Sequence, residues 1–166
     1  MARVSGAAIG NEEVMRKLIA EIGVLKGGML HSSFYCHSAV GQLDCAVTHT
    51  LLSLIEESMP PSDSALEALI AEVEAGRYIS PDSSLPDWGV NDKNVWLVPP
   101  MAEPGHICIS NENTGDYSTE EGGQPQQFTY EQFRVALKHW REFLKLMARE
   151  GKHKLLGRRY EAVFPE

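Results

Sequence analysis

The stretch Phe128-Thr-Tyr-Glu-Gln-Phe-Arg-Val-Ala-Leu-Lys-His-Trp-Arg-Glu-Phe-Leu144 decides most about the fold of this 166-residue chain. Thr129-x-x-Gln132 has the form of a helix capping box, and Phe128 and Phe133 are spaced to form the hydrophobic staple around it. Apolar residues then recur at alternating steps of four and three, at Phe133, Leu137, Trp140, Leu144 and Met147. We therefore predict a capped amphipathic helix of about twenty residues and roughly 30 Å, which ends at Gly151.

Three more helices are predicted before this one. The first is capped by Asn11 and continues through Leu25 to a pair of glycines at 27–28. The second covers residues 43–58, and the third begins at Ser62 or Ser64 and ends at Gly76.

Short apolar runs predict the strands. They lie at residues 29–36, 95–98, 106–109 and 160–164, and the middle two are expected to form a hairpin. The predicted class is α+β: a single domain over residues 1–166 with three N-terminal helices, a small antiparallel sheet and a long C-terminal amphipathic helix.

Charge divides the chain into two parts. Residues 1–130 carry 6 Lys/Arg against 18 Asp/Glu, whereas residues 131–166 carry 9 against 5. The favoured interpretation of the basic stripe on the last helix is a solvated face, or one packed near the protein's own carboxylates. Nucleic acid is not the expected partner, because aromatic residues do not interleave with the stripe, although a nucleic-acid accessory role stays as a third alternative. The stripe consists of Arg134, Lys138, Arg141, Lys145 and Arg149.

Composition bears on the cellular setting. No apolar run approaches 18 residues, so neither a transmembrane helix nor a membrane partner is expected. Cys36, Cys45 and Cys108 form an odd set without the spacing of a disulfide framework, which favours a reducing cytoplasm.

A metal site is the first possible chemistry. Cys36, His37, Cys45 and His49 are all metal-ligand types, but they lack the paired spacing of structural zinc sites. We therefore expect no metal and no cofactor.

A cysteine hydrolase is the second possibility. Asp44-Cys45 opens a predicted helix, where the helix dipole lowers a thiol pKa, while His106 begins a predicted strand and Asn111 follows it. This order is similar to that of the papain-like NlpC/P60 amidases, which implies Cys45 as nucleophile, His106 as base and Asn111 as orienting residue. The family continues Asp-Cys-Ser-Gly, whereas this chain reads Asp-Cys-Ala-Val. We expect instead that Cys45 is buried away from His106, because apolar residues follow it on the same helix.

Two polar segments suggest a protein-binding surface. They combine carboxylates with amphipathic aromatic residues, as the rims of protein interfaces do. The predicted contact residues are Asp87, Trp88, Asp92, Glu112, Asp116, Tyr117, Glu120 and Glu121.

The C-terminal stretch also carries a family resemblance. The pattern Thr129-x-Glu131-x-Phe133, then Ala136-Leu137, Trp140 and Phe143-Leu144, resembles the ending of bacterial polymorphic-toxin immunity proteins. Such proteins bind and neutralise a cognate toxin in the cytoplasm, and basic nucleases are among those toxins. The resemblance implies an inhibitor of a cognate toxin, and the acidic segments are its expected binding surface. The cysteine amidase remains the alternative.

Overall fold

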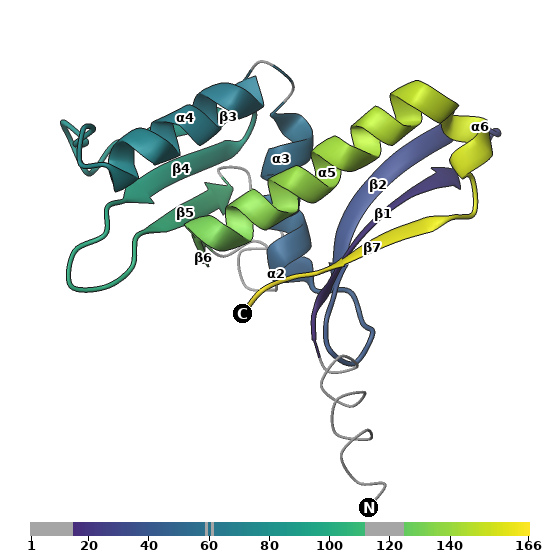
Figure 1. Cartoon of the computed structure of the whole chain (residues 1–166), viewed down its shortest axis with the longest axis horizontal. Helices are drawn as coiled ribbons and strands as arrows, with labels where there is room; N and C mark the ends of the chain where they lie inside the picture. Colours follow the sequence, from purple (N-terminus) through teal and green to yellow (C-terminus); the bar gives the residue numbers. More distant parts are fainter. Residues whose placement is uncertain (1–14, 59, 61, 112–124) are drawn as a thin grey trace, which may run out of the picture.

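The computed structural model describes residues 15–58, 60, 62–111 and 125–166, and these form two antiparallel sheets (Figure 1). Sheet A has the order β2-β1-β7, with β1 at Lys17–Val24, β2 at Leu30–His37 and β7 at Arg159–Val163. Sheet B has the order β3-β4-β5-β6. Its strands are Trp88–Val90, Lys93–Val98, His106–Asn111 and Gln126–Thr129.

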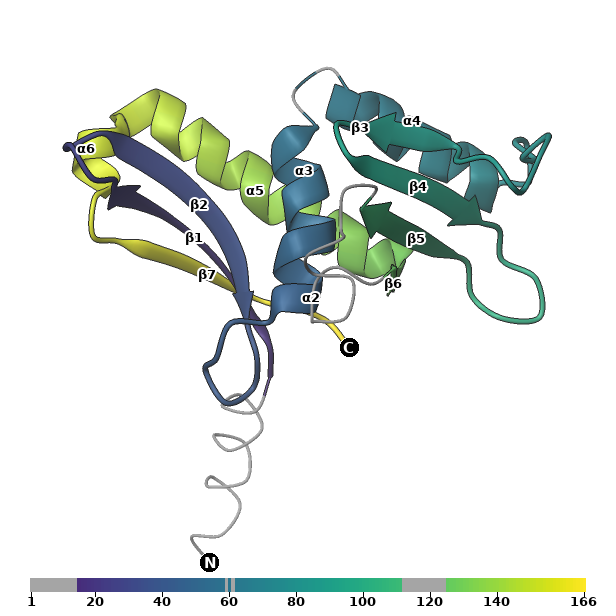
Figure 2. The same ribbon diagram turned by 180° about the vertical axis from the view of Figure 1, so that it is seen from behind.

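Helices connect and cover the sheets. A continuous helical segment lies between them and consists of α2 (Cys45–Val47), the π-helical turn η1 (Thr48–Leu52) and α3 (Ser53–Glu57). α4 (Ser62–Glu74) packs on sheet B, while α5 (Tyr130–Glu150) crosses from sheet B to sheet A (Figures 1 and 2). The short α6 (Lys152–Leu155) leads back to β7. Among the described helices, none is both long and apolar enough to cross a bilayer.

The prediction of three N-terminal helices is wrong, and so is that of one small sheet. Residues 17–24 form β1, and the start of the predicted helix, at Asn11, lies outside the described residues. Leu18 and Ile22 are four residues apart, which suits a helix, but with Ala20 they also line one face of a strand. Gly27 and Gly28 have φ values of 99° and 89° and form the turn to β2 instead of a helix cap.

The last helix has the capping box that the sequence predicts. Thr129 Oγ1 accepts a hydrogen bond from the Gln132 backbone N–H at 3.0 Å, and Gln132 Oε1 accepts one from the Thr129 N–H at 2.9 Å. Phe133, Leu137 and Trp140 are buried, and Leu144 and Met147 are partly buried. The apolar stripe is wider than predicted, because Ala136 and Phe143 are buried beside it.

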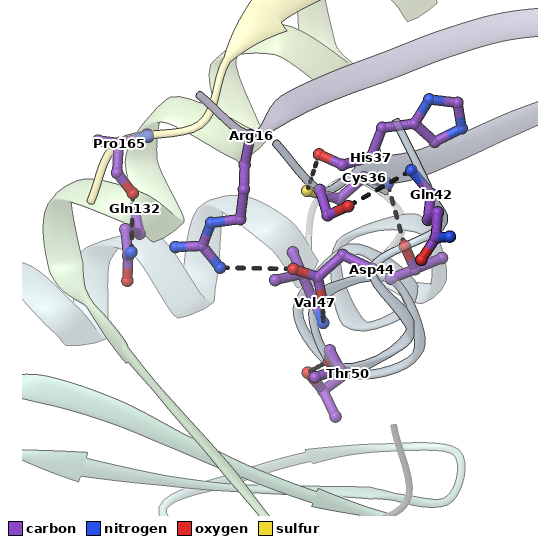
Figure 3. A network of polar contacts seen from close by, with 12 residues as sticks. Arg16, Cys36, His37, Gln42, Asp44, Val47, Thr50, Gln132 and Pro165 are labelled. Atoms are coloured by element: carbon purple, nitrogen blue, oxygen red, sulfur yellow. Dashed lines mark hydrogen bonds and ion pairs between the residues drawn. The ribbon is translucent and has the colours of Figure 1, made fainter. Parts of the chain in front are cut away.

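The C-terminal residues contact both sheets. Phe164 is fully buried and packs edge-on against Phe128 of β6, with 6.5 Å between ring centroids. The guanidinium of Arg16 lies 4.8 Å from the centroid of the Phe164 ring. It also lies 3.6 Å from the Asp44 carboxylate (Figure 3). Gln132 Nε2 donates to the Pro165 carbonyl at 2.8 Å, so the end of the chain also contacts the start of α5.

Candidate functional site

The residues of the alternative hydrolase site do not converge. His106 begins β5 and Asn111 ends it, so about 17 Å of strand separates them. Their separation of five residues also directs their side chains to opposite faces of sheet B. Asn111 Nδ2 donates to the His49 carbonyl at 3.3 Å, which places the helical segment at the end of β5 far from His106.

Cys45 occupies the first position of α2, as the sequence suggests. Asp44 is the N-cap residue, and its carboxylate accepts a hydrogen bond from the Val47 N–H at 3.2 Å (Figure 3). The expectation that Cys45 is buried is wrong, because it is partly exposed at the helix N-terminus. Cys36 is the buried cysteine of this region, and burial raises the pKa of its thiol to about 12.

The possible metal ligands are spread over several elements. Cys36 and His37 lie on β2, while Cys45 and His49 lie on the helical segment. Within the described ranges, no group of three or more Cys, His, Asp or Glu side chains is arranged to hold a metal ion.

Three of the eight predicted contact residues stabilise the fold itself. Asp87, just before the start of β3, accepts hydrogen bonds with its carboxylate from the Tyr78 hydroxyl at 2.9 Å and from the Leu97 N–H at 2.8 Å. Asp92 lies 3.1 Å from the ammonium of Lys93, and Trp88 packs against the core. The remaining five, Glu112, Asp116, Tyr117, Glu120 and Glu121, lie outside the described residues.

Lys93 is buried between carboxylates of two elements. It is 4% exposed and lies 3.3 Å from Glu57 of α3 and 3.1 Å from Asp92. The two carboxylates, which are partly exposed, compensate a buried ammonium that would be costly to leave without any partner. Lys93 therefore joins the central helical segment to sheet B and adds no positive charge to the surface.

The basic stripe is divided between two environments. Arg134 pairs with Glu74 of α4, and Arg141 pairs with Asp63 and Glu67, each at 3.0 Å. These contacts agree with packing against the protein's own carboxylates. Lys138, Lys145 and Arg149 instead have exposed side chains.

One face of sheet B carries no helix among the described residues. Val95 and Leu97 point toward α4 and α5, whereas Asn94, Trp96 and Val98 alternate to the other face. Cys108 lies opposite Trp96, and Gln127 follows on β6. In Figure 2 this face of β4 and β5 is turned toward the viewer, with α4 and α5 behind the sheet.

A pocket adjoins this face at the edge of β4. It has a volume of about 310 Å³, and its lining includes Tyr78, Ile79, Trp96, Val98 and Pro99. Ile79 is 84% exposed, and nearby in the sequence Met101, in the loop after β4, is 87% exposed. We call Ile79, Trp96, Val98 and Pro99 the Trp96 surface; Ile79, Val98 and Pro99 are exposed, and Trp96 is half-buried. Large apolar side chains exposed together are typical of interaction sites.

The stretch of sequence that contributes the Trp96 surface is rich in carboxylates. Residues 78–133 carry nine Asp/Glu and a single Lys/Arg, which is the buried Lys93. Of the carboxylates that the structure describes there, Asp82, Glu103 and Glu131 are exposed. Sequence reasoning missed this surface. Residues alternate between the two faces of the strand from Lys93 to Val98, and Lys93 is the one Lys/Arg within residues 78–133, which together were a usable signal.

Comparison of the chain with protein-family models, with curated proteins and with solved structures finds no significant match.

Proposed function

We propose that this chain is a non-catalytic inhibitor that binds a basic protein through the Trp96 surface. Its C-terminal helix resembles that of immunity proteins, which neutralise a toxin in the cytoplasm of the producing cell. The single observation that carries the proposal is an apolar surface centred on Trp96 and set in an acidic half of the chain.

The chemistry of this surface suits protein recognition. Trp is enriched among the residues that dominate binding energy, because it buries a large rigid area at small entropic cost. Carboxylates around such a centre attract a positively charged partner and accelerate association. Asp87 supports the surface from within, since it fixes the Tyr78 ring and the Leu97 backbone beside the pocket.

The experiment requires the natural partner. We expect a toxin domain to be encoded beside the gene of this chain, and co-expression of the two should restore bacterial growth. Trp96→Ala should abolish that protection, while Met29→Ala, which removes a 69% exposed apolar side chain in the β1–β2 turn of sheet A, should not. Full protection by a folded Trp96→Ala variant would contradict the proposal.

A further inference from the structure

β7 is an edge strand of sheet A. The Phe164 N–H donates to the Arg16 carbonyl at 2.9 Å. Arg16 and Phe164 are therefore a hydrogen-bonded residue pair of the antiparallel ladder between β1 and β7. Hydrogen-bonded pairs alternate along the ladder, and Tyr160 and Ala162 therefore direct their backbone groups toward β1. The N–H and C=O groups of Arg159, Glu161 and Val163 point away from it. In the part of the chain that the structure describes, no strand pairs with this edge (Figure 1).

A groove runs beside this edge, between α5 and β7. It has a volume of about 330 Å³. Its apolar part includes Phe143 and Tyr160, whose ring centroids are 5.5 Å apart, and Leu146. Lys145 and Arg149 supply positive charge, and the carboxylate that lines the groove, Glu142, lies 3.9 Å from Lys138.

The sequence from the end of α5 to the start of β7 is strongly basic, and Lys145 and Arg149 line the groove itself. Residues 145–159 carry six Lys/Arg and one carboxylate, in a protein whose net charge is −8. All six basic residues are exposed: Lys145, Arg149, Lys152, Lys154, Arg158 and Arg159. Two of them have weak or exposed pairings, Arg149 with Glu150 at 3.8 Å and Arg159 with Glu21 at 3.2 Å. Most of this positive charge is therefore available to a ligand.

We propose that the free edge of β7 and the adjoining groove bind an extended acidic segment of a partner protein by strand addition. The backbone of the segment pairs with Arg159, Glu161 and Val163, which gives affinity without regard to sequence. Alternate side chains of the segment face α5. An apolar one lies over Phe143 and Tyr160, and carboxylates two residues to either side reach toward Lys145 and Arg149.

This site is separate from the Trp96 surface and does not rest on the proposed function. Sheet B lies at one end of the molecule, and the end of α5 with α6 lies at the other (Figure 1). The pocket beside Trp96 is lined by residues in and just after β4 and by the chain before β3. A nucleic acid would satisfy the positive charge but has no use for the strand edge, which is why a polypeptide is the occupant that the geometry favours.

The first test uses a labelled peptide, Thr-Glu-Thr-Phe-Thr-Glu-Thr, titrated against the full chain by fluorescence anisotropy. We expect saturable binding that weakens with salt, and at least about tenfold weaker binding of the peptide with Lys in place of Glu. N-methylation of alternate backbone nitrogens keeps the charge but removes strand pairing. We expect the better-placed of the two N-methylated versions to lose about tenfold in affinity. Equal binding of the unmethylated and both methylated peptides would overturn the proposal.

Variants of the chain locate the site. Glu161→Pro removes an outward N–H from an edge strand, where proline is tolerated, and Glu161→Ala is its matched control. We expect the first to weaken peptide binding and the second to leave it within about twofold. Lys145→Glu with Arg149→Glu should also weaken it, and this pair serves as the test should Glu161→Pro fail to fold. Tighter binding of single-stranded DNA than of the peptide, or self-association of the chain that excludes the peptide, would refute the assignment.

Discussion

The Phe34 ring of β2 stacks on the indole of Trp140 of α5, with 5.0 Å between ring centroids and 11° between planes. Phe143 and Tyr160 extend this aromatic contact to β7. The stacked pair therefore joins sheet A to the helix that also covers sheet B.

Truncation of Trp140 should be strongly destabilising. Trp140 is 7% exposed, so Trp140→Ala removes a large buried ring and leaves a cavity. We expect a loss of about 3–5 kcal/mol in the free energy of unfolding, measured by urea denaturation. Trp140→Phe keeps the stacking with Phe34 and should cost less. An alanine variant as stable as the wild type would show that the aromatic contact is not part of the core.

Removal of Phe164 tests whether the C-terminus holds the sheets together. Phe164→Ala should cost about 3–5 kcal/mol, because the side chain is fully buried against Phe128 and Arg16. Val163→Ala is the matched control, since Val163 is half-exposed. If both variants unfold at the same urea concentration, Phe164 does not have this role.

The ion pairs between α4 and α5 should contribute more to the stability of the fold than those at the surface. Arg141→Ala leaves the buried Asp63 without its guanidinium partner, and we expect a loss of roughly 2 kcal/mol in stability. Lys138→Ala removes a side chain that is 78% exposed and pairs at 3.9 Å, so we expect under about 0.5 kcal/mol. Thermal denaturation of the two variants checks this order, and an equal effect would contradict it.

Stability should fall as the pH rises toward neutrality because of Glu56. Burial raises the pKa of its carboxyl from 4.5 to about 7, and the charge of Glu57 acts in the same direction, against a hydrogen bond from the Phe34 backbone N–H and the charge of Lys93. Between pH 4.5 and about 7, the Glu56 carboxyl is therefore protonated in the folded state but ionised in the unfolded chain. The stabilising contribution is complete below pH 4.5 and is lost through that window.

Glu56→Gln should flatten this part of the pH profile and make the protein more stable than the wild type at pH 8. The neutral amide retains an acceptor for the Phe34 N–H without the cost of a buried charge. Glu142→Gln, at an exposed position on α5, is the control and should leave the profile unchanged. Parallel profiles for the wild type and Glu56→Gln would show that Glu56 is not the group responsible.

Local signals in the sequence predicted local structure well. Thr129 and Gln132 form a capping box within four residues, so no distant contact is needed to recognise the start of α5. Leu18 and Ile22 were ambiguous, because residues four apart share a face in both a helix and a strand. Pairing with β2 and with β7, which is distant in the sequence but adjacent to β1 in space, decides the strand.

The candidate site was less accessible to sequence reasoning. Asp87 was predicted to contact a partner, but its carboxylate accepts hydrogen bonds from the Tyr78 hydroxyl and the Leu97 N–H. Tertiary packing positions both donors, so no local pattern in the sequence reveals them. The hydrolase alternative, in contrast, could have been weakened from the sequence. His106 and Asn111 are five residues apart in and just after a predicted strand, and an odd separation places side chains on opposite faces.

The most direct test of the central claim is the dissociation constant of the chain and its toxin domain, measured by calorimetry for the wild type, Trp96→Ala and Met29→Ala. Binding through the Trp96 surface predicts that Trp96→Ala weakens the complex by at least about thirtyfold, or roughly 2 kcal/mol, while Met29→Ala stays within about twofold of the wild type. Equal affinities for all three proteins, with Trp96→Ala folded, would contradict it.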